Sequence, residues 1–445
     1  MNKTNTPHFL LVGHDGCHNR GCEALVRTTV SILREEFPNA QFTVAVMYPE
    51  HEGPLTDIPG LKIIPGYNTV AHLLVSNSSG DTLRSRLLRK VKNWLPYGLV
   101  TGKSLFTRKA KMVLRPQLRP ENERGFLHVS HLKNIMLNSD AVISIGGDIF
   151  NEDYGANIFY AMEPVEYAQF LGRKTIIFGA SIWEVKTRWL EDRMREMFKR
   201  TDLITVRDKE TQSYLRSIGI NKNVVHVADG AFLMPAKSSE RTLLPWPTCE
   251  NKIIGFNGSD QIKDYLPQSK CQQVSTDFIK FFQSLVDQHG CKVVFIPHDC
   301  LPGAHERDFL FALEQMIQRP GDVFLLPVGL DAPETKDVIR QCHAFIAMRF
   351  HSSVAALSQC IPTLGMSHSK KFPSLHRFVY GHTEYLINYE DISFNLLLEK
   401  LKKLLDNREE IQRKLKERIP KIQEQARMGG KFVKDVLLKN IKTEI

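Results

Sequence analysis

The chain has 445 residues, of which 42% are apolar and 24% are charged. This length is too great for one hydrophobic core, so we expect two or three domains, and two large ones is the simplest arrangement. The composition is close to that of globular proteins, which excludes a disordered or fibrous chain and predicts a soluble fold.

The net charge of +10 is concentrated in two stretches, residues 84–124 and residues 400–442. The first holds twelve Lys or Arg against two Glu. Neither carries the interleaved aromatics or repeats of a nucleic-acid reader, so no nucleic-acid partner is expected. Contact with an anionic membrane surface and a solvated basic face both stay open.

Residues from about 76 to 124 are predicted to form an insertion, which is either an amphipathic segment that contacts lipid or a helical cover on the first domain. We favour the cover, because no long apolar stripe is present.

The eight cysteines include no Cys-x-x-Cys pair and no paired histidine spacing, so neither zinc nor another metal is predicted. The N-terminal stretch contains only four consecutive apolar residues, too few for a signal peptide or a membrane span. We therefore expect a cytoplasmic protein with reduced thiols, with a peripheral position at the inner face of the membrane as an option. The sequence carries no signal for an oligomeric state.

The chain opens with a short apolar strand at residues 9–12, a glycine-bearing loop and a helix to about residue 37. The loop spacing, Gly-x-x-Gly-x-x-x-x-Gly, fits neither the dinucleotide fingerprint nor a Walker loop. A helix N-terminus there favours an anion, and Asn19, Arg20 and Glu23 are the polar groups that could face a ligand. The alternative is that these glycines only form tight turns.

Strands are predicted at residues 41–47, 140–145, 174–179, 203–206 and 224–227, with helices between them. Strand and helix alternation of this kind predicts a parallel, doubly wound sheet. Gly147 and Asp148 follow the second of these strands, where Asp148 is either a base or hydrogen-bond acceptor or a helix cap. Arg207 follows the fourth, either for ligand contact or for an ion pair with Asp208 or Asp229. We expect a Rossmann-like domain over residues 1–235.

Residues 236–251 are rich in proline and break the periodicity, so they are the predicted linker. A second Rossmann-like domain is expected over residues 252–390, with strands at 252–256, 292–296, 323–326 and 344–348. His298 follows the second of these strands, either as an acid/base or phosphate-binding group or as the neighbour of a helix cap. Residues 391–445 should form one or two long charged helices with a packed leucine stripe.

The most informative stretch is residues 344–372. A buried strand ends at Arg349, Ser352 and Ser353 are candidate caps of the next helix, and a further strand at 361–366 leads to Lys370 and Lys371. Ligands of parallel sheets bind beyond the carboxyl ends of the strands, so Arg349, His351 and the two lysines should converge. Between Asp337 and Glu384 the sequence has no Asp or Glu. Such a crevice should attract a compact polyanion and let a histidine move protons.

These residues carry a resemblance. Arg-x-His before a small-residue helix, Ile-Pro-Thr and Ser-x-Ser-x-Lys-Phe together resemble the polysaccharide pyruvyl transferase family. Matching blocks occur in order at residues 19–25, 146–150, 207–209, 229–232 and at Glu334-x-Lys336. One departure is visible, because His368 stands where the family is expected to carry Tyr.

The resemblance implies two Rossmann-like domains of GT-B type facing a cleft, with the acceptor on the N-terminal side and the donor on the C-terminal side. It implies transfer of the enolpyruvyl group of phosphoenolpyruvate onto two hydroxyls of a sugar as a cyclic ketal, without cofactor or metal. The acceptor would be a polysaccharide sugar or a lipid-linked oligosaccharide. The implied catalytic residues are His351, Arg349 and Asp148. The implied phosphoenolpyruvate-binding residues are Arg207, Arg349, Lys371 and His298. The implied acceptor-binding residues are Asn19, Arg20, Glu23, Gly147 and His368.

Two other functions stay open. A GT-B glycosyltransferase using a nucleotide sugar would normally place a carboxylate beside its donor in the C-terminal domain, and the acid-free window argues against that. A non-catalytic glycan- or nucleotide-binding protein would need losses in the site, of which His368 is the one candidate. The acceptor sugar and its linkage are not indicated by the sequence.

Overall fold

The computed structural model describes residues 6–47, 49–66, 126, 129–153, 158–238, 243–247, 250–300, 306–369 and 371–439. The predicted basic insertion at 76–124 and Lys370 lie outside these residues. The chain divides into two compact units. The first comprises residues 1–16, 29–227 and 428–445, and the second comprises residues 17–28 and 228–427.

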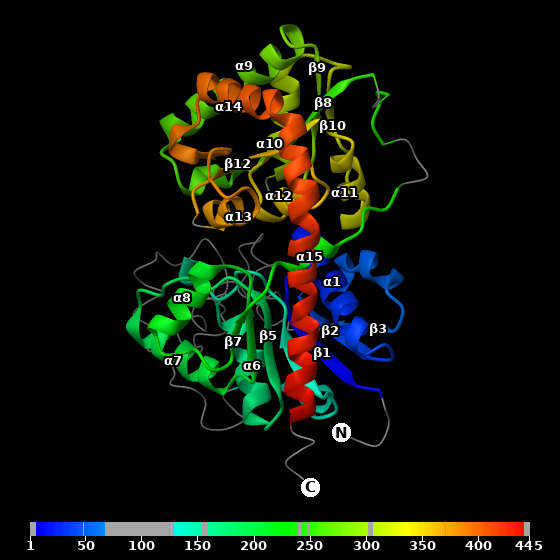
Figure 1. Cartoon of the computed structure of the whole chain (residues 1–445), viewed down its shortest axis with the longest axis vertical. Coiled ribbons are helices and arrows are strands. Elements are labelled where there is room, and N and C mark those ends of the chain that lie inside the picture. The colour runs from blue at the N-terminus through cyan, green and yellow to red at the C-terminus, as the bar shows by residue number, and fades with distance from the viewer. Residues whose placement is uncertain are drawn as a thin grey trace, which may run out of the picture. The chain divides into compact units, whose positions relative to one another are not determined.

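The first unit is built on a seven-stranded sheet of order β3-β2-β1-β4-β5-β6-β7, and every pair of neighbours is parallel (Figure 1). Its strands are β1 (His8–His14), β2 (Gln41–Val46), β3 (Leu61–Pro65), β4 (Ala141–Ser144), β5 (Thr175–Ala180), β6 (Leu203–Val206) and β7 (Val224–His226). Its helices are α5 (Lys133–Leu137), α6 (Ile158–Phe170), α7 (Arg188–Arg200) and α8 (Lys209–Ser217).

The second unit is built on a six-stranded parallel sheet of order β10-β9-β8-β11-β12-β13. Its strands are β8 (Lys252–Asn257), β9 (Cys291–Phe295), β10 (Val323–Leu325), β11 (Ala344–Ala347), β12 (Thr363–Ser367) and β13 (Leu386–Asn388). Its helices are α9 (Gln268–Asp287), α10 (Glu306–Ile317), α11 (Ala332–Arg340), α12 (Phe350–Leu357), α13 (Lys371–Tyr380) and α14 (Phe394–Asp406). The chain order of the strands reverses between β8 and β11, which is the usual ligand position of such sheets.

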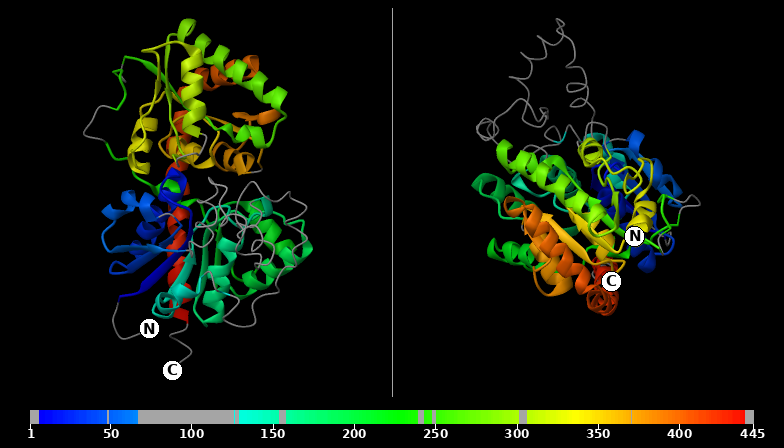
Figure 2. Two further views of the ribbon diagram at one scale, coloured as in Figure 1. Left: turned by 180° about the vertical axis from the view of Figure 1, so that it is seen from behind. Right: turned by 90° about the horizontal axis from the view of Figure 1, so that it is seen from above.

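The strands of the second unit carry apolar side chains on both faces of the sheet, which explains its layers. Along β11, Ala344 and Ile346 belong to one core cluster, whereas Phe345 and Ala347 belong to another. Successive strand residues point to opposite faces, so a fully apolar strand must be covered on both. Helices α9, α10 and α14 contribute to the first cluster, and α11 contributes Val338 and Ile339 to the second. The ribbons show helices on both faces of this sheet (Figure 2). The doubly wound character predicted from the sequence follows from this burial.

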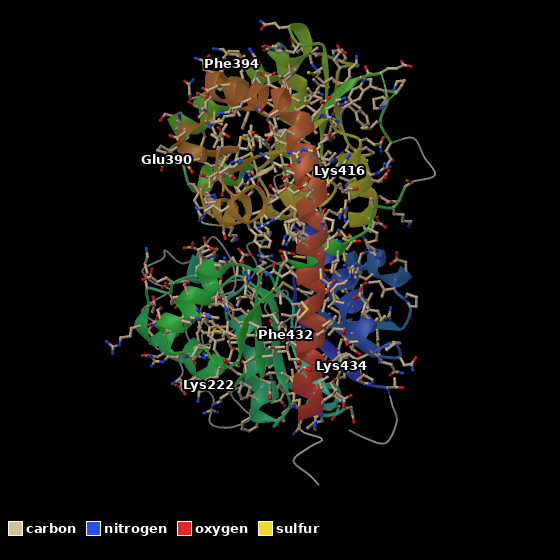
Figure 3. All side chains as sticks on the ribbon, in the orientation of Figure 1. Lys222, Glu390, Phe394, Lys416, Phe432 and Lys434 are labelled. Atoms are coloured by element: carbon tan, nitrogen blue, oxygen red, sulfur yellow. The ribbon has the colours of Figure 1, made fainter. Side chains whose placement is uncertain are left out.

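Two helices are divided between the units. The N-terminal turns of α1 (Arg20–Glu36) belong to the second unit up to residue 28, and α15 (Arg408–Lys439) belongs to the second unit up to residue 427. Beyond residue 427, α15 packs within the first unit. There Lys434, labelled in Figure 3, lies 2.9 Å from the carboxylate of Glu36.

The division differs from the expected boundaries at residues 17–28, 228–251 and 428–445. Residues 17–28 leave the first unit because Ala24 lies in the core of the second. The expected linker at 236–251 is part of the second unit, where Leu244 and Trp246 are buried in the cluster that α11 supplies. Proline in this stretch interrupts helical periodicity but not burial.

Among the described helices, none is both long enough and apolar enough to cross a lipid bilayer.

Candidate functional site

Asn257, the last residue of β8, joins the strand ends of the second unit. Its Oδ1 accepts hydrogen bonds from the backbone N–H of Arg349 at 3.0 Å and from the hydroxyl of Ser352 at 2.9 Å. Its Nδ2 donates to the carbonyl of Ile296 at 3.1 Å and to the carboxylate of Glu306 at 3.2 Å. The side chain is fully buried, so these bonds fix the ends of β8, β9 and β11 relative to one another.

Glu306, at the start of α10, is the buried carboxylate of this site. One oxygen, Oε1, accepts a hydrogen bond from Nε of Arg349 at 2.8 Å. The other, Oε2, accepts from the backbone N–H groups of His298 and Asp299. Burial raises the pKa of Glu306, and Arg349 with the two backbone donors lowers it in part. The ion pair therefore holds Arg349 in place as a fixed cation.

His298 lies in the loop after β9 and is 5% exposed. Neither of its ring nitrogens has a hydrogen-bond partner among the described residues. Burial, and then the positive charges of His351, Arg349 and Arg20, hold its pKa well below the usual value. A neutral imidazole in these surroundings offers a ligand one donor and one acceptor.

His351 lies in the first turn of α12 with its ring against the backbone of Gly21. A Cβ atom on Gly21 would lie 2.6 Å from Cγ of His351, so only glycine permits this packing. Nε2 of His351 lies 3.6 Å from Oδ2 of Asp229. The predicted cap is wrong: Arg349 is the N-cap of α12, and Ser352 lies inside the helix, where its hydroxyl donates to the carbonyl of Arg349.

The first turn of α1 joins this group of residues in the second unit. Asn19 caps the turn by accepting from the backbone N–H of Gly21 at 2.9 Å, and the backbone N–H of Arg20 donates to the carbonyl of His298 at 2.9 Å. Glu23 is fully buried, lies 2.7 Å from Nε of Arg27, and accepts from the backbone N–H of Ala332 at 2.9 Å. The acceptor-binding roles of Asn19, Arg20 and Glu23 stay predictions.

A small pocket lies at the centre of these contacts. Its polar wall carries four groups that are cationic or become cationic on protonation: Arg20, His298, Lys336 and His351. Its apolar wall is made of short side chains and one methionine: Ala24, Ala231, Met234, Ala332 and Ala355, with Thr335 beside them. The pocket therefore offers cationic or protonatable groups to a small anionic ligand.

The acid-free window of the sequence does not correspond to an acid-free site. Glu306 pairs with Arg349, Oδ2 of Asp299 lies 3.5 Å from the same guanidinium, and Asp229 lies beside His351. The fold brings these carboxylates in from other strand ends. The acid-free window therefore does not count against a glycosyltransferase.

Lys371 and His368 follow β12, the strand next to β11. Lys371 is the first residue of α13, and burial lowers the pKa of its amine to about 8. Phe372, the next residue, packs edge-on against Phe350, which places the starts of α12 and α13 side by side. His368 is exposed and stacks on the ring of Tyr265. Their binding roles stay predictions.

The remaining predicted residues lie in the first unit. Gly147 and Asp148 follow β4, and the guanidinium of Arg207 lies over Gly147, where a Cβ atom would be 2.8 Å from Nη2. Nε of Arg207 donates to the hydroxyl of Ser181 at 2.9 Å, and that hydroxyl donates to Asp208 at 2.7 Å. The predicted ion pair with Asp208 is thus bridged by a serine. The roles of Gly147, Asp148 and Arg207 stay predictions.

Sequence reasoning missed three residues of this site: Asn257 and Glu306, which join the strand ends, and Lys336, which lines the pocket. Asn257 could have been found, because a polar residue that ends an apolar strand has the same placement as Arg349. Glu306 had no local signal beyond an acidic helix start. Lys336 was recognised as part of a family block only.

The model of the polysaccharide pyruvyl transferase family matches residues 19–370, which is well over half of the chain. The chain belongs to the polysaccharide pyruvyl transferase family. The matched residues include Asn257 with its hydrogen-bond partners, the Glu306–Arg349 pair and the residues that line the pocket. A curated relative, the amylovoran biosynthesis protein AmsJ of Erwinia amylovora, is 20% identical over 443 residues, which cover 96% of this chain and 99% of that protein.

Solved structures similar to this family member confirm the predicted fold class, two Rossmann-like domains of GT-B type. A UDP-GlcNAc 2-epimerase from Neisseria meningitidis bound to UDP-GlcNAc matches with a TM-score of 0.56 and 10% identity, over 98% of this chain and 100% of that one. UGT71G1 from Medicago truncatula, complexed with UDP-glucose, matches with a TM-score of 0.55 and 11% identity, again over 98% and 100%. At this identity the likeness concerns the fold alone.

Proposed function

We propose that the protein transfers the enolpyruvyl group of phosphoenolpyruvate to two hydroxyls of a sugar, forming a cyclic ketal and releasing phosphate. One observation carries the proposal. In a member of the pyruvyl transferase family, His298 and His351 line one small pocket with Arg20 and Lys336, and Arg349 follows the end of the neighbouring strand β11. Phosphoenolpyruvate is a small molecule with a carboxylate and a phosphate, and its negative charge suits these side chains.

The reaction needs an acid at the methylene carbon and a base at the attacking hydroxyl. Protonation of the methylene carbon makes the enol carbon electrophilic, and the first hydroxyl adds to it with loss of its proton. Phosphate then leaves with its bonding electron pair, and the second hydroxyl adds to the same carbon and loses its proton. Of the two hydroxyl protons, one replaces the proton that the acid gave to the new methyl group, and the other leaves with phosphate.

The two histidines take different roles in this proposal. His351, whose Nε2 lies 3.6 Å from Oδ2 of Asp229, is assigned as the proton donor. His298 is held neutral by burial and by neighbouring positive charge, which suits it to accept the hydroxyl proton. Asp148 stays the alternative base predicted from the sequence. No metal is needed in this scheme, because phosphate leaves readily once the enol carbon is protonated.

We propose Arg349 as the main residue that binds phosphoenolpyruvate, the donor substrate. Its Nε pairs with Glu306 and its Nη2 lies 3.5 Å from Oδ2 of Asp299, so the side chain is held in place. A guanidinium can bind a carboxylate or a phosphate with two parallel bonds. Each charge-assisted bond contributes about 1.5–3 kcal/mol. Lys371 and Arg207 are proposed as further donor-binding cations.

For the acceptor we propose a sugar of a polysaccharide or of its lipid-linked precursor. The relative AmsJ is a protein of amylovoran biosynthesis by name, which supports an exopolysaccharide pathway. A cytoplasmic location, with peripheral contact at the inner face of the membrane, agrees with a lipid-linked acceptor. The exposed pair of His368 and Tyr265 is suited to stack against a sugar ring.

Calorimetric titration with phosphoenolpyruvate, beside an assay of phosphate release with oligosaccharide acceptors, tests the proposal. His351→Asn should bind the donor normally and lose about 10²- to 10⁴-fold in phosphate release, because it removes the acid. Arg349→Lys keeps the charge that Glu306 needs and should weaken donor binding about 10- to 100-fold, because the fork is lost.

His289→Asn is the matched control, because this histidine is exposed on the same unit, and it should change neither measurement. Titration with UDP-sugars runs in parallel. Binding of a UDP-sugar without binding of phosphoenolpyruvate would overturn the proposal and identify a glycosyltransferase.

A further inference from the structure

Lys336 is a buried lysine that the scheme above leaves without a role. It lies in α11, a helix whose start is fixed by a capping box between Asp331 and Glu334. Its side chain is 3% exposed and lines the pocket together with Arg20, His298 and His351. The ammonium donates one hydrogen bond, to the carbonyl of Met234. An ammonium has three donors, so a ligand in the pocket could accept from the others.

The surroundings of Lys336 disfavour its charged form. No described carboxylate lies within ion-pair distance of its Nζ, and burial alone lowers the pKa of its amine to about 7. The titratable and charged groups around the pocket come from α1, from the loop after β9, from α12 and from the segment before β8: Arg20, Glu23, His298, His351 and Asp229. Both carboxylates of this group are engaged with other cations. The charged form of Lys336 therefore lacks a countercharge among the described residues, and a bound anion would supply it.

We propose that Lys336 is an anion-binding residue of this pocket, and that it takes up a proton from solvent as the anion enters. The identity of the anion, phosphoenolpyruvate, rests on the proposed function, whereas the coupling of anion binding to protonation does not. Before binding, the amine is largely neutral above neutral pH. The incoming carboxylate or phosphate supplies the missing countercharge, the amine gains one proton, and the resulting ammonium donates to the anion.

The alternative is a structural lysine that only ties α11 to the carbonyl of Met234. That contact would not change when a ligand binds, so it predicts no proton uptake. The number of protons exchanged on binding therefore separates the two roles, whereas loss of activity alone would not.

The experiment is calorimetric titration with phosphoenolpyruvate at pH 8 and at pH 6, each in two buffers of different ionisation enthalpy. The difference in apparent enthalpy gives the number of protons taken up. Wild-type protein should take up ~1 proton more at pH 8 than at pH 6 from Lys336, in addition to any contribution from Lys371. Lys336→Met should lose this increment and bind about 10-fold more weakly. Lys336→Arg, which stays charged, should bind without the increment.

Lys237→Met is the matched control, because Lys237 belongs to the same unit and its side chain is 60% exposed. It should reproduce the wild-type proton uptake. Equal uptake in wild type and Lys336→Met, with phosphoenolpyruvate still bound, would overturn this inference and leave the proposed function standing.

Titration with inorganic phosphate separates the remaining outcomes. If phosphate binds with uptake that depends on Lys336 while phosphoenolpyruvate does not bind, the inference holds and the proposed function fails. If neither anion binds, both fail.

Discussion

At the scale of single residues, Lys336 stabilises a bound anion at the expense of the folded chain. The pKa of its amine is about 7 in the folded protein against the usual value of 10.5. Below about pH 7 the amine is protonated in both states, and the full desolvation penalty opposes folding. Between about pH 7 and pH 10.5 the unfolded chain binds the extra proton, so this contribution to stability rises with pH.

Replacing Lys336 by Met should therefore stabilise the protein. We expect the free energy of unfolding to rise by about 2–5 kcal/mol at pH 6 and by less at pH 9, because the penalty falls as the amine becomes neutral. Urea unfolding of wild type and variant at the two pH values measures this. A variant that is less stable than wild type at pH 6 would show that the bond to Met234 outweighs the buried charge.

The residues that sequence reasoning found are those whose signal is local. Arg349, His298 and His351 each follow an apolar strand, and parallel strands bring their carboxyl ends to one edge of the sheet. Their partners have no such signal. Glu306 is 43 residues from Arg349 along the chain, and only the order of the strands shows that the two meet.

At the scale of elements, α13 packs on β12 through a glycine. A Cβ atom on Gly365 would lie 2.7 Å from Nε2 of His376 and 2.8 Å from the ring of Phe372. His376 is fully buried, and burial lowers the pKa of its ring to about 3. The close approach sets the position of α13 and therefore of Lys371 at its start.

Gly365→Ala should destabilise the second unit by about 1–3 kcal/mol, because neither ring has room to move. The double variant with His376→Ala should be more stable than the sum of the two single effects predicts, by about 1 kcal/mol, because the shortened side chain relieves part of the clash. Chemical denaturation of all four proteins in a double-mutant cycle measures the coupling. Strict additivity would mean that the two positions do not share this contact.

The alternation of strands and helices could be predicted because central parallel strands are apolar along their whole length. Strand β5, for example, is buried at every position. Strands β3 and β13 were not predicted, and both lie at the edge of their sheet. The other two edge strands, β7 and β10, were predicted because each begins with at least two consecutive apolar residues, whereas Lys62 interrupts β3. Strand β13 is as short as β7 and β10, and it was missed although it also begins with two apolar residues. The Ser352 cap was mispredicted because α12 begins almost directly after β11, so Arg349 is its N-cap and Ser352 lies inside the helix.

At the scale of the whole molecule, the end of α15 is a structural part of the first unit. A Cβ atom on Gly430 would lie 2.8 Å from the backbone carbonyl oxygen of Ile32, and one on Gly429 would lie 2.8 Å from the ring of Phe178. Two adjacent glycines weaken a helix, but here they allow it to approach α1 and β5.

Gly430→Ala should lower the stability of the first unit by about 1–3 kcal/mol, although alanine is the better helix former, because a backbone carbonyl cannot yield. Lys421→Ala, at an exposed position of the same helix, is the control and should be neutral. Hydrogen exchange of the β5 amides, beside urea unfolding, reports the change. Slower exchange in Gly430→Ala than in wild type would contradict the packing described.

The division of the chain has a consequence for its synthesis on the ribosome. Residues 17–28 are made ahead of most of the first unit but belong to the second, and residues 428–445 are made after the second unit but belong to the first. Multidomain chains commonly fold from the N-terminus, one domain after another, while translation continues. Here, when residue 227 has been made, the first unit still lacks residues 428–445 and the second still lacks residues 228–427. Both units therefore stay incompletely folded during much of translation. We expect the nascent chain to depend more on chaperones than a protein with the same domains in tandem would.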